Sequence, residues 1–398
     1  MFRARDAADA AEIVSAAFDA SRALEVVAGG SKRALGQPFR PAARLEISAL
    51  AGVVDYDPAE LVLTAQAATP LAQIETMLAE QRQMLSFEPP DWRALLGHTG
   101  APTLGGTIAC NLAGPRRVRA GAARDHTLGF AAIDGRGQAW RAGGRVVKNV
   151  TGYDMCKLQC GAFGTLSVLT ELSVRVMPKP ETSANLLFAG LDDAAAIRLA
   201  SRALNTPHEV SAVAHLPLAA ARRAGFDSAT TVIRVEGPAP SVSFRVQALR
   251  TLLGDAAEQD ATGTLALWHS IGGVHDLLPD GPVLWRVCCP PAAAPSVLAA
   301  VQAEYGDAAE AYYDWGGGLV WLSLDAAAAG FGGGAAIVRA ALRQASGHAT
   351  LFLAPPVVRA VVPAFEPQPA PLAALSARVK AGFDPRGILN PGRMVLES

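Results

Sequence analysis

A short apolar run that ends in two glycines constrains this 398-residue chain most strongly. The run, Leu24 to Val27, is typical of a strand, and Gly29, Gly30, Ser31 and Lys32 follow it. Because glycine lacks a Cβ atom, such a loop can turn with positive φ and present consecutive main-chain N–H groups to an anion such as pyrophosphate. The Walker spacing and a G-x-G-x-x-G element that opens a helix are both absent, which disfavours the usual ATP and NAD folds. Taken alone, the loop is more often an ordinary turn.

Three further stretches place glycines beside side chains that form hydrogen bonds. The second stretch runs from Pro102 to Gly114, the third from Lys148 to Glu171, and the fourth from Asn390 to Met394. Glycine pairs let a flat ligand approach the main chain, and threonine and asparagine offer hydrogen bonds to it. A bulged strand is the structural alternative for the second stretch. The candidates in these stretches are Thr103, Gly105, Gly106, Thr107, Asn111, Gly161, Gly164, Thr165, Asn390 and Arg393.

Composition limits the class of protein. At 398 residues and 51% apolar side chains, the chain can bury two cores. With a formal net charge of -1, the chain as a whole is not attracted electrostatically to nucleic acid or to an anionic membrane, so we expect no nucleic-acid partner. The N-terminal residues lack an unbroken apolar region, so we expect no secretory signal or transmembrane segment, and a cytoplasmic protein.

The order of apolar runs predicts an α+β organisation. Up to about Met177 short strands and amphipathic helices mix, and Pro178 and Pro180 mark a change in composition. Two similar sets of strand and helix patterns follow, which resemble split βαβ units and can share one sheet. A last helix near Leu372 to Phe383 leads into the fourth stretch. We therefore predict domains at 1–178 and 179–370, and a C-terminal segment at 371–398 that returns to the first domain.

Residues of catalytic or metal-binding type form no recognisable site. The five cysteines include no C-x-x-C pair, which argues against a disulfide framework, a zinc site or an iron-sulfur cluster, and we predict no metal. The histidines and arginines near the glycine stretches are more often packed or solvated than catalytic, so no catalytic residue is assigned. Those considered are His98, His126, His269, His275, His348, Arg116, Arg117 and Arg145.

The four stretches, in this order and spacing, resemble the FAD-linked oxidase family of vanillyl-alcohol oxidase and para-cresol methylhydroxylase (PCMH). Within it, the chain is similar to the FAD-binding E subunits of bacterial glycolate oxidase. The motifs that carry this likeness are Glu88-Pro89-Pro90, Leu112 to Arg117, Arg124-Asp125, Lys148-Asn149, Gly152-Tyr153-Asp154 and Asp314 to Gly317.

The resemblance implies a PCMH-type FAD-binding domain of two subdomains, followed by a ferredoxin-like α+β cap domain with an antiparallel sheet. It assigns Gly29, Gly30, Ser31 and Lys32 to the pyrophosphate of FAD, and the candidates of the other stretches to the rest of the cofactor. Several relatives attach FAD through a histidine directly after the glycine pair. Ser31 stands at that position here, so we expect FAD to be bound non-covalently.

The resemblance also implies a function and partners. We expect a subunit of a complex that oxidises glycolate to glyoxylate, with a second FAD-containing subunit and an iron-sulfur subunit that takes the electrons. Such a complex can associate peripherally with the inner membrane. Two alternatives stay open: a self-sufficient flavin oxidoreductase acting on another 2-hydroxy acid or alcohol, and a flavin-containing assembly subunit without chemistry of its own.

Overall fold

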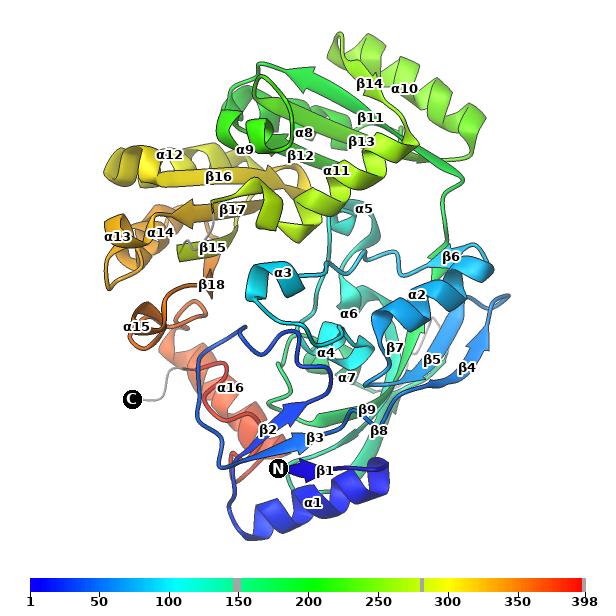
Figure 1. The fold of residues 1–398 in the computed structure, drawn as a ribbon, viewed down its shortest axis with the longest axis vertical. Coiled ribbons are helices and arrows are strands. Elements are labelled where there is room, and N and C mark those ends of the chain that lie inside the picture. The colour runs from blue at the N-terminus through cyan, green and yellow to red at the C-terminus, as the bar shows by residue number, and fades with distance from the viewer. Residues whose placement is uncertain (146–151, 280–282, 396–398) are drawn as a thin grey trace.

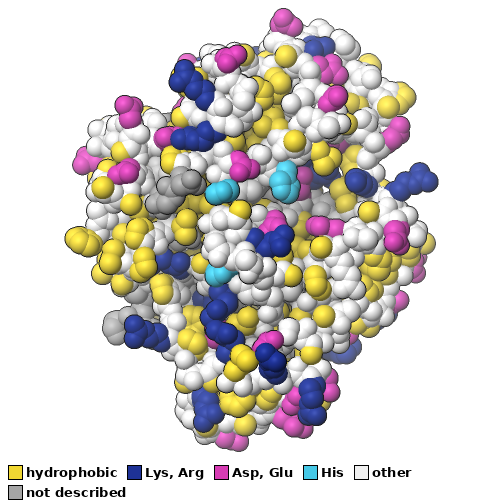
Figure 2. All heavy atoms as spheres, in the orientation of Figure 1, with side chains coloured by type: hydrophobic (Ala, Val, Ile, Leu, Met, Phe, Trp, Pro, Cys, Tyr) yellow, Lys and Arg dark blue, Asp and Glu magenta, His cyan; other side chains and the backbone are white. Residues whose placement is uncertain are grey.

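The computed structural model describes residues 1–398 except 146–151, 280–282 and 396–398. In Figure 1 a large sheet with its helices occupies the upper and left part of the molecule, and smaller sheets occupy the lower right. The predicted divisions at 178 and 370 fall between β10 and β11 and at the first residue of α16. The face in Figure 2 carries basic and acidic side chains interspersed, as the near-zero net charge leads one to expect.

The N-terminal strands form a small parallel sheet. Its order is β1-β3-β2, and the strands are β1 (Phe2–Arg3), β2 (Leu24–Val27) and β3 (Ala43–Glu46). Helix α1 (Ala7–Asp19) begins where the Asp6 carboxylate accepts a hydrogen bond from the main-chain N–H of Asp9, and it packs Val14 beside Leu24 and Leu45 in a shared core. This core holds β2 in place, so the loop that follows β2 starts from a fixed point.

A five-stranded antiparallel sheet, in the order β4-β5-β9-β7-β8, lies beside it. Leu71, Ile74, Met77 and Leu78 have the spacing that predicts a helix lying on a sheet, and α2 (Leu71–Glu80) packs against this sheet through Leu71, Ile74 and Leu78. The sequence Asp134-Gly135-Arg136-Gly137 predicts a hairpin turn, and it joins β7 to β8. The strands are β4 (Val53–Asp57), β5 (Val62–Gln66), β7 (Thr127–Ile133), β8 (Ala139–Gly143) and β9 (Val168–Arg175), and β6 (Gln83–Met84) pairs with β10 (Met177–Pro178). The short helices are α3 (Arg93–Leu96), α4 (Leu104–Ala109), α5 (Arg117–Ala120), α6 (Ala123–His126) and α7 (Met155–Gln159).

The second part of the chain forms one eight-stranded antiparallel sheet of two similar halves. The order is β14-β11-β13-β12-β16-β17-β15-β18, so each half has the order 4-1-3-2 of a ferredoxin-like unit. The halves meet where β12 pairs with β16, with His215 opposite Tyr313. The strands are β11 (Thr182–Ala189), β12 (Ala212–Leu216), β13 (Thr230–Gly237), β14 (Ala257–Gln259), β15 (Val283–Cys288), β16 (Ala309–Asp314), β17 (Leu319–Leu324) and β18 (His348–Leu353).

Helices cover both faces of this sheet, and one of these faces also packs against the N-terminal part. On β15, Trp285 and Val287 pack in a core with α12 and α14, whereas Leu284 and Cys288 pack with Leu35, Trp92 and Leu112 of the N-terminal part. The helices are α8 (Asp193–Leu204), α9 (Leu218–Arg223), α10 (Ala239–Leu253), α11 (Ala261–Gly273), α12 (Ala294–Tyr305), α13 (Ala326–Ala329), α14 (Ala335–Leu342), α15 (Pro356–Arg359) and α16 (Ala370–Phe383), with single 3-10 turns at η1 (His275–Leu277), η2 (Pro291–Ala293), η3 (Gly306–Ala308) and η4 (Trp315–Gly317).

Candidate functional site

The loop after β2 packs main chain against main chain with a second glycine loop. A Cβ atom at Gly29 would lie 1.9 Å from the carbonyl oxygen of Ala101, and one at Gly100 would lie 1.7 Å from the carbonyl oxygen of Gly29. Gly30 adopts a φ of 76°, in the left-handed region. The sequence needs glycine here because no other residue allows this approach and this turn.

Four consecutive main-chain donors of this loop are left free. Within the described part of the chain, no group accepts a hydrogen bond from the main-chain N–H of Gly29, Gly30, Ser31 or Lys32. The Lys32 ammonium donates to the Ser31 hydroxyl at 3.2 Å and forms no ion pair with a described carboxylate, and burial lowers its pKa. Consecutive free N–H groups beside a cation form a binding site for an anion.

The second stretch forms the wall opposite this loop, as a helix and not as a bulged strand. Thr103 caps α4, its hydroxyl accepting a hydrogen bond from the main-chain N–H of Gly106 at 3.3 Å. Gly105 lies against β5, because its N–H donates to the Ala67 carbonyl at 2.7 Å and a Cβ there would lie 2.8 Å from the Ala67 Cβ. Glycine at this position lets α4 approach the sheet closely.

The C-terminal tail connects the two walls. The Asn390 side chain accepts a hydrogen bond from the main-chain N–H of Val26 at 2.9 Å and donates to the carbonyl of Phe163 at 2.9 Å. The buried Arg393 guanidinium donates to the carbonyls of Lys32 and Arg33 at 3.1 and 3.0 Å. The tail therefore fixes the free donors of the glycine loop by binding the carbonyl groups of the same loop.

These segments line one pocket, and ten of the fourteen predicted site residues lie in its wall. Those ten are Gly29, Gly30, Ser31, Lys32, Thr103, Gly105, Gly106, Gly164, Asn390 and Arg393. The remaining lining residues are Val26, Val27, Ala28, Arg33, Ile47, Ala67, Ala109, Cys110, Phe163, Ser167 and Leu169. Among these, Cys110, Phe163 and Ser167 are within two residues of the predicted site residues Asn111, Gly164 and Thr165, and this proximity was the only sequence signal for them.

The other four predicted residues lie behind the wall. Thr107 is fully buried in α4, and the Asn111 side chain accepts a hydrogen bond from the main-chain N–H of Arg124 at 3.0 Å. Gly161 donates its N–H to the Ile108 carbonyl, and the Thr165 hydroxyl donates to the Ala162 carbonyl. The Gly161 hydrogen bond joins α4 to the 161–165 turn. Lys148 to Thr151, which belong to the third stretch, are outside the described residues.

None of the histidines and arginines considered from the sequence is among the described residues that line the pocket. His126 is buried and hydrogen-bonds the Ala120 carbonyl at 2.8 Å, while burial lowers its pKa. Arg145 forms an exposed ion pair with Asp55 at 2.6 Å. His269, His275 and His348 are exposed, and no group of three possible metal ligands occurs among the described residues.

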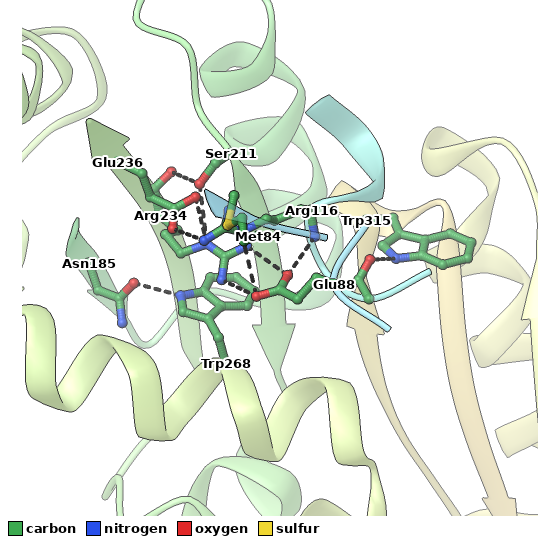
Figure 3. Close-up of polar contacts among 10 residues, drawn as sticks. Met84, Glu88, Arg116, Asn185, Ser211, Arg234, Glu236, Trp268 and Trp315 are labelled. Carbon is green, nitrogen blue, oxygen red and sulfur yellow. Dashed lines mark hydrogen bonds and ion pairs between the residues drawn. The ribbon is translucent and has the colours of Figure 1, made fainter. Parts of the chain in front are cut away.

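An ion-pair network of one buried and three half-buried side chains joins the N-terminal part to the large sheet (Figure 3). Glu88 accepts hydrogen bonds from the Arg234 guanidinium of β13 at 2.9 and 3.0 Å, and the Arg116 guanidinium binds Glu236 at 2.6 Å. Burial opposes ionisation of Glu88, but Arg234 and Arg116 outweigh it and hold its pKa below the ordinary value. The two arginines and two glutamates balance in charge and fix the sheet over the pocket-bearing part.

Known proteins share this arrangement. Residues 1–143 match a protein-family model described as an FAD binding domain. The chain is 36% identical to the glycolate oxidase subunit GlcE of Escherichia coli (strain K12), over 97% of this chain and 96% of that protein. It is 38% identical to the glycolate oxidase subunit GlcD of Bacillus subtilis (strain 168), over 27% of this chain and 23% of that protein.

Among solved structures, the chain is similar to p-cresol methylhydroxylase with substrate bound, at a TM-score of 0.71 and 14% identity. The match covers 98% of this chain and 88% of that chain. This likeness confirms the predicted fold class. No helix in the described part of the chain combines the length and apolar composition that a bilayer crossing requires.

Proposed function

Because the chain belongs to the family of FAD-linked oxidoreductases that contains the glycolate oxidase subunit GlcE, we propose that it is the FAD-holding subunit of a complex that oxidises glycolate to glyoxylate. The observation that carries this proposal is the pocket beside β2, where four free main-chain donors and Lys32 face the same space. A dinucleotide pyrophosphate needs these donors, and the described residues that line the pocket include no carboxylate side chain to repel it.

The chain's own residues have separable tasks toward FAD. Gly29 to Lys32 bind the pyrophosphate, Asn390 and Arg393 orient that loop, and Phe163 and Leu169 give the pocket an apolar surface for the ring systems. When bound, FAD supplies an acceptor for the hydride that leaves the α-carbon of a 2-hydroxy acid.

The electrons must then leave this chain. The sequence has no C-x-x-C pair that would hold an iron-sulfur cluster, so we assign the onward transfer to an iron-sulfur subunit, with a second FAD-containing subunit in the same complex. The complex provides the contact with the inner membrane.

Reconstitution tests this proposal. The chain is purified alone and together with its flavin and iron-sulfur partners, and each preparation is assayed with glycolate, D-lactate and an artificial electron acceptor. We expect glycolate turnover by the complex and little by the chain alone. Appreciable turnover by the chain alone would support the self-sufficient oxidoreductase instead.

Variants of the glycine loop separate a flavin role from a purely structural one. Gly30→Asp places a side chain at a φ of 76° and a negative charge in the anion site, so we expect loss of FAD and of complex activity. Lys32→Met removes one charge-assisted contact worth about 1.5–3 kcal/mol, or roughly 10- to 100-fold in FAD affinity. Gly332→Asp, where a Cβ meets nothing within 4 Å, is the matched control. If the complex with Gly30→Asp lacks FAD but keeps its activity, the assembly-subunit alternative is correct.

The same preparations report how FAD is attached. Since a serine hydroxyl cannot form the histidyl bond, we expect acid precipitation of the purified chain to release all the yellow cofactor into the supernatant. Flavin that stays on the pellet would contradict non-covalent binding.

A further inference from the structure

Two arginines stack on one tryptophan at the junction between the large sheet and the N-terminal part. The Arg117 guanidinium carbon of α5 lies 4.7 Å from the centre of the Trp315 ring, and that of Arg286 on β15 lies 4.9 Å from it. Arg117 and Arg286 are half-buried and Trp315 is buried. Residues from three distant parts of the chain thus gather two positive charges around one aromatic ring.

Within the described part of the chain, these two arginines have no counterion, unlike their neighbours. Arg116 and Arg234 are neutralised by Glu88 and Glu236 in the network of Figure 3. Among the described residues, no carboxylate oxygen lies within 4 Å of the Arg117 or Arg286 guanidinium, and neither donates a hydrogen bond to a protein group. Burial, and secondly the charge of Arg286, lower the pKa of Arg117, as expected for two cations held close together. Unpaired, partly buried charges of one sign indicate a place for a charge of the other sign.

The backbone around Trp315 is held in an unusual conformation. Trp315 has a φ of 54°, in the left-handed region that favours glycine. The Asp314 carboxylate accepts a hydrogen bond from its main-chain N–H at 2.7 Å, and its indole N–H donates to the Gly114 carbonyl at 3.0 Å. Such a strained residue persists only where its surroundings fix it, often at a ligand site, and here it fixes the surface on which both guanidiniums lie.

The arginine pair and the FAD pocket border the same apolar cluster. Side chains alternate along β15, so Arg286 shares the face of Leu284 and Cys288, which turns toward the N-terminal part. Cys110 and Phe163, which line the pocket, pack against the same apolar cluster as Cys288 and Trp315. Arg286 therefore belongs to the large-sheet side of this cluster, whereas Arg117, on α5, comes from the N-terminal part.

We propose that Arg117 and Arg286, positioned by Trp315, bind the carboxylate of the small 2-hydroxy acid on which the complex acts. This inference rests on the proposed function for the identity of the acid, but not for the presence of a carboxylate site. A guanidinium can donate two parallel hydrogen bonds to the two oxygens of a carboxylate. Stacking on Trp315 restricts each guanidinium to a few orientations.

Binding of oxalate, a carboxylate that offers no hydride, tests the site directly. Isothermal titration calorimetry on the purified FAD-containing chain compares oxalate with glycolamide, the uncharged analogue of glycolate. We expect oxalate to bind and glycolamide not to bind. Arg117→Met and Arg286→Met should each weaken oxalate binding at least tenfold. Arg286→Lys should restore binding only in part, because lysine donates from a single nitrogen and cannot form the paired hydrogen bonds of a guanidinium. Arg145→Met, which removes an exposed paired arginine, should leave it unchanged.

A measurement on the unaltered chain guards against variants that fail to fold. Phenylglyoxal modifies accessible arginines, and we expect oxalate to slow modification of the peptides that carry Arg117 and Arg286 but not of the peptide that carries Arg145. Unchanged oxalate affinity in folded, FAD-containing variants would overturn the proposal, and so would equal modification with and without oxalate.

Kinetics of the complex separate this inference from the proposed function. If the complex oxidises glycolate, both methionine variants should raise the KM for glycolate at least tenfold with unchanged FAD content. If the complex oxidises glycolate and its KM for glycolate is the same in both methionine variants as in the unaltered complex, the arginine site is refuted and the function is left intact. Arginine-dependent oxalate binding in a complex that does not oxidise glycolate would refute the function and leave the carboxylate site intact.

Discussion

Cys288 is the thiol whose surroundings favour ionisation. Burial opposes ionisation, but Arg286, His348 and Arg117 outweigh it and lower the pKa of Cys288. Burial raises the pKa of the other four thiols: that of Cys110, that of Cys156 to about 12, and those of Cys160 and Cys289 to about 11. Because the thiolate is the reactive form, we expect iodoacetamide at pH 8 to alkylate Cys288 first, as measured by peptide mass spectrometry over time. Arg286→Met should slow this alkylation, whereas Arg145→Met should not, and faster labelling of Cys160 or Cys289 would contradict the prediction.

At the residue scale, the sequence predicts glycines well and charged side chains poorly. Gly29 and Gly105 occupy places where a Cβ would collide with main chain, and such needs are visible in a glycine-rich pattern. Nothing in the pattern distinguishes Arg117 from its neighbour Arg116, although one stacks on Trp315 and the other is paired with Glu236. The partner of a long side chain depends on contacts 100 or more residues away, so spacing alone could not assign these roles.

Helix α16 stands out from the molecule and is fixed at its C-terminal end. None of its residues is buried, and in Figure 1 it runs along the lower left of the molecule toward β2. The Lys380 ammonium donates to the Leu389 carbonyl at 3.1 Å and pairs with the buried Asp384 carboxylate at 2.5 Å. Lys380→Met leaves that carboxylate unpaired and should lower the free energy of unfolding by about 2 kcal/mol. Leu372→Ser with Leu375→Ser, both at exposed positions, should change it by less than about 0.5 kcal/mol. Urea unfolding measures both, and equal losses would show that the helix packs along its whole length.

At the element scale, periodicity predicts the longer helices and isolated strands but not the pairing between them. The α2 stripe, the α16 helix and the 134–137 hairpin are confirmed. Strand β16 has no place among the predicted elements, although it joins the two halves of the large sheet, because its alternation of Ala309 to Asp314 is short and follows directly on α12 and η3. Helix α4 was also not predicted, since two glycines in six residues weaken any helical pattern, and the Thr103 cap and the contact with Ala67 stabilise it instead.

At the scale of the whole molecule, the family resemblance supplies what periodicity cannot. Asn390 contacts Val26 across 364 positions in the chain, and only the order of all four stretches indicates that the tail returns to the glycine loop. The comparisons confirm this resemblance and FAD as the cofactor. The contacts at the junction between the two parts could not be predicted from the sequence. The ion pairs of Glu88 and the stacking on Trp315 depend on how the two parts are arranged, and no local pattern encodes that arrangement.

The junction also contains a carboxyl group that makes stability depend on pH. Burial raises the pKa of Asp314 to about 7, an effect to which Glu88 adds and which the Trp315 N–H, Arg234 and Arg286 oppose. In the unfolded chain this carboxyl titrates near its ordinary value of 3.8, so the folded state binds its proton more tightly. The group's stabilising contribution is therefore complete below pH 3.8 and is lost as the pH rises toward 7.

Asp314→Asn removes this dependence without removing the hydrogen bond, because the amide oxygen still accepts from the Trp315 N–H. In the folded chain the Asp314 carboxyl is ionised mainly above pH 7, and the asparagine variant cannot ionise there. The variant should therefore raise the free energy of unfolding more at pH 8 than at pH 5, and the two increases should differ by about 2 kcal/mol. Thermal and urea unfolding at the two pH values measure the difference, and Asp276→Asn, at an exposed position, is the control. A gain that is equal at pH 5 and pH 8 would mean that Asp314 is ionised throughout this range, with Arg234 and Arg286 compensating its burial.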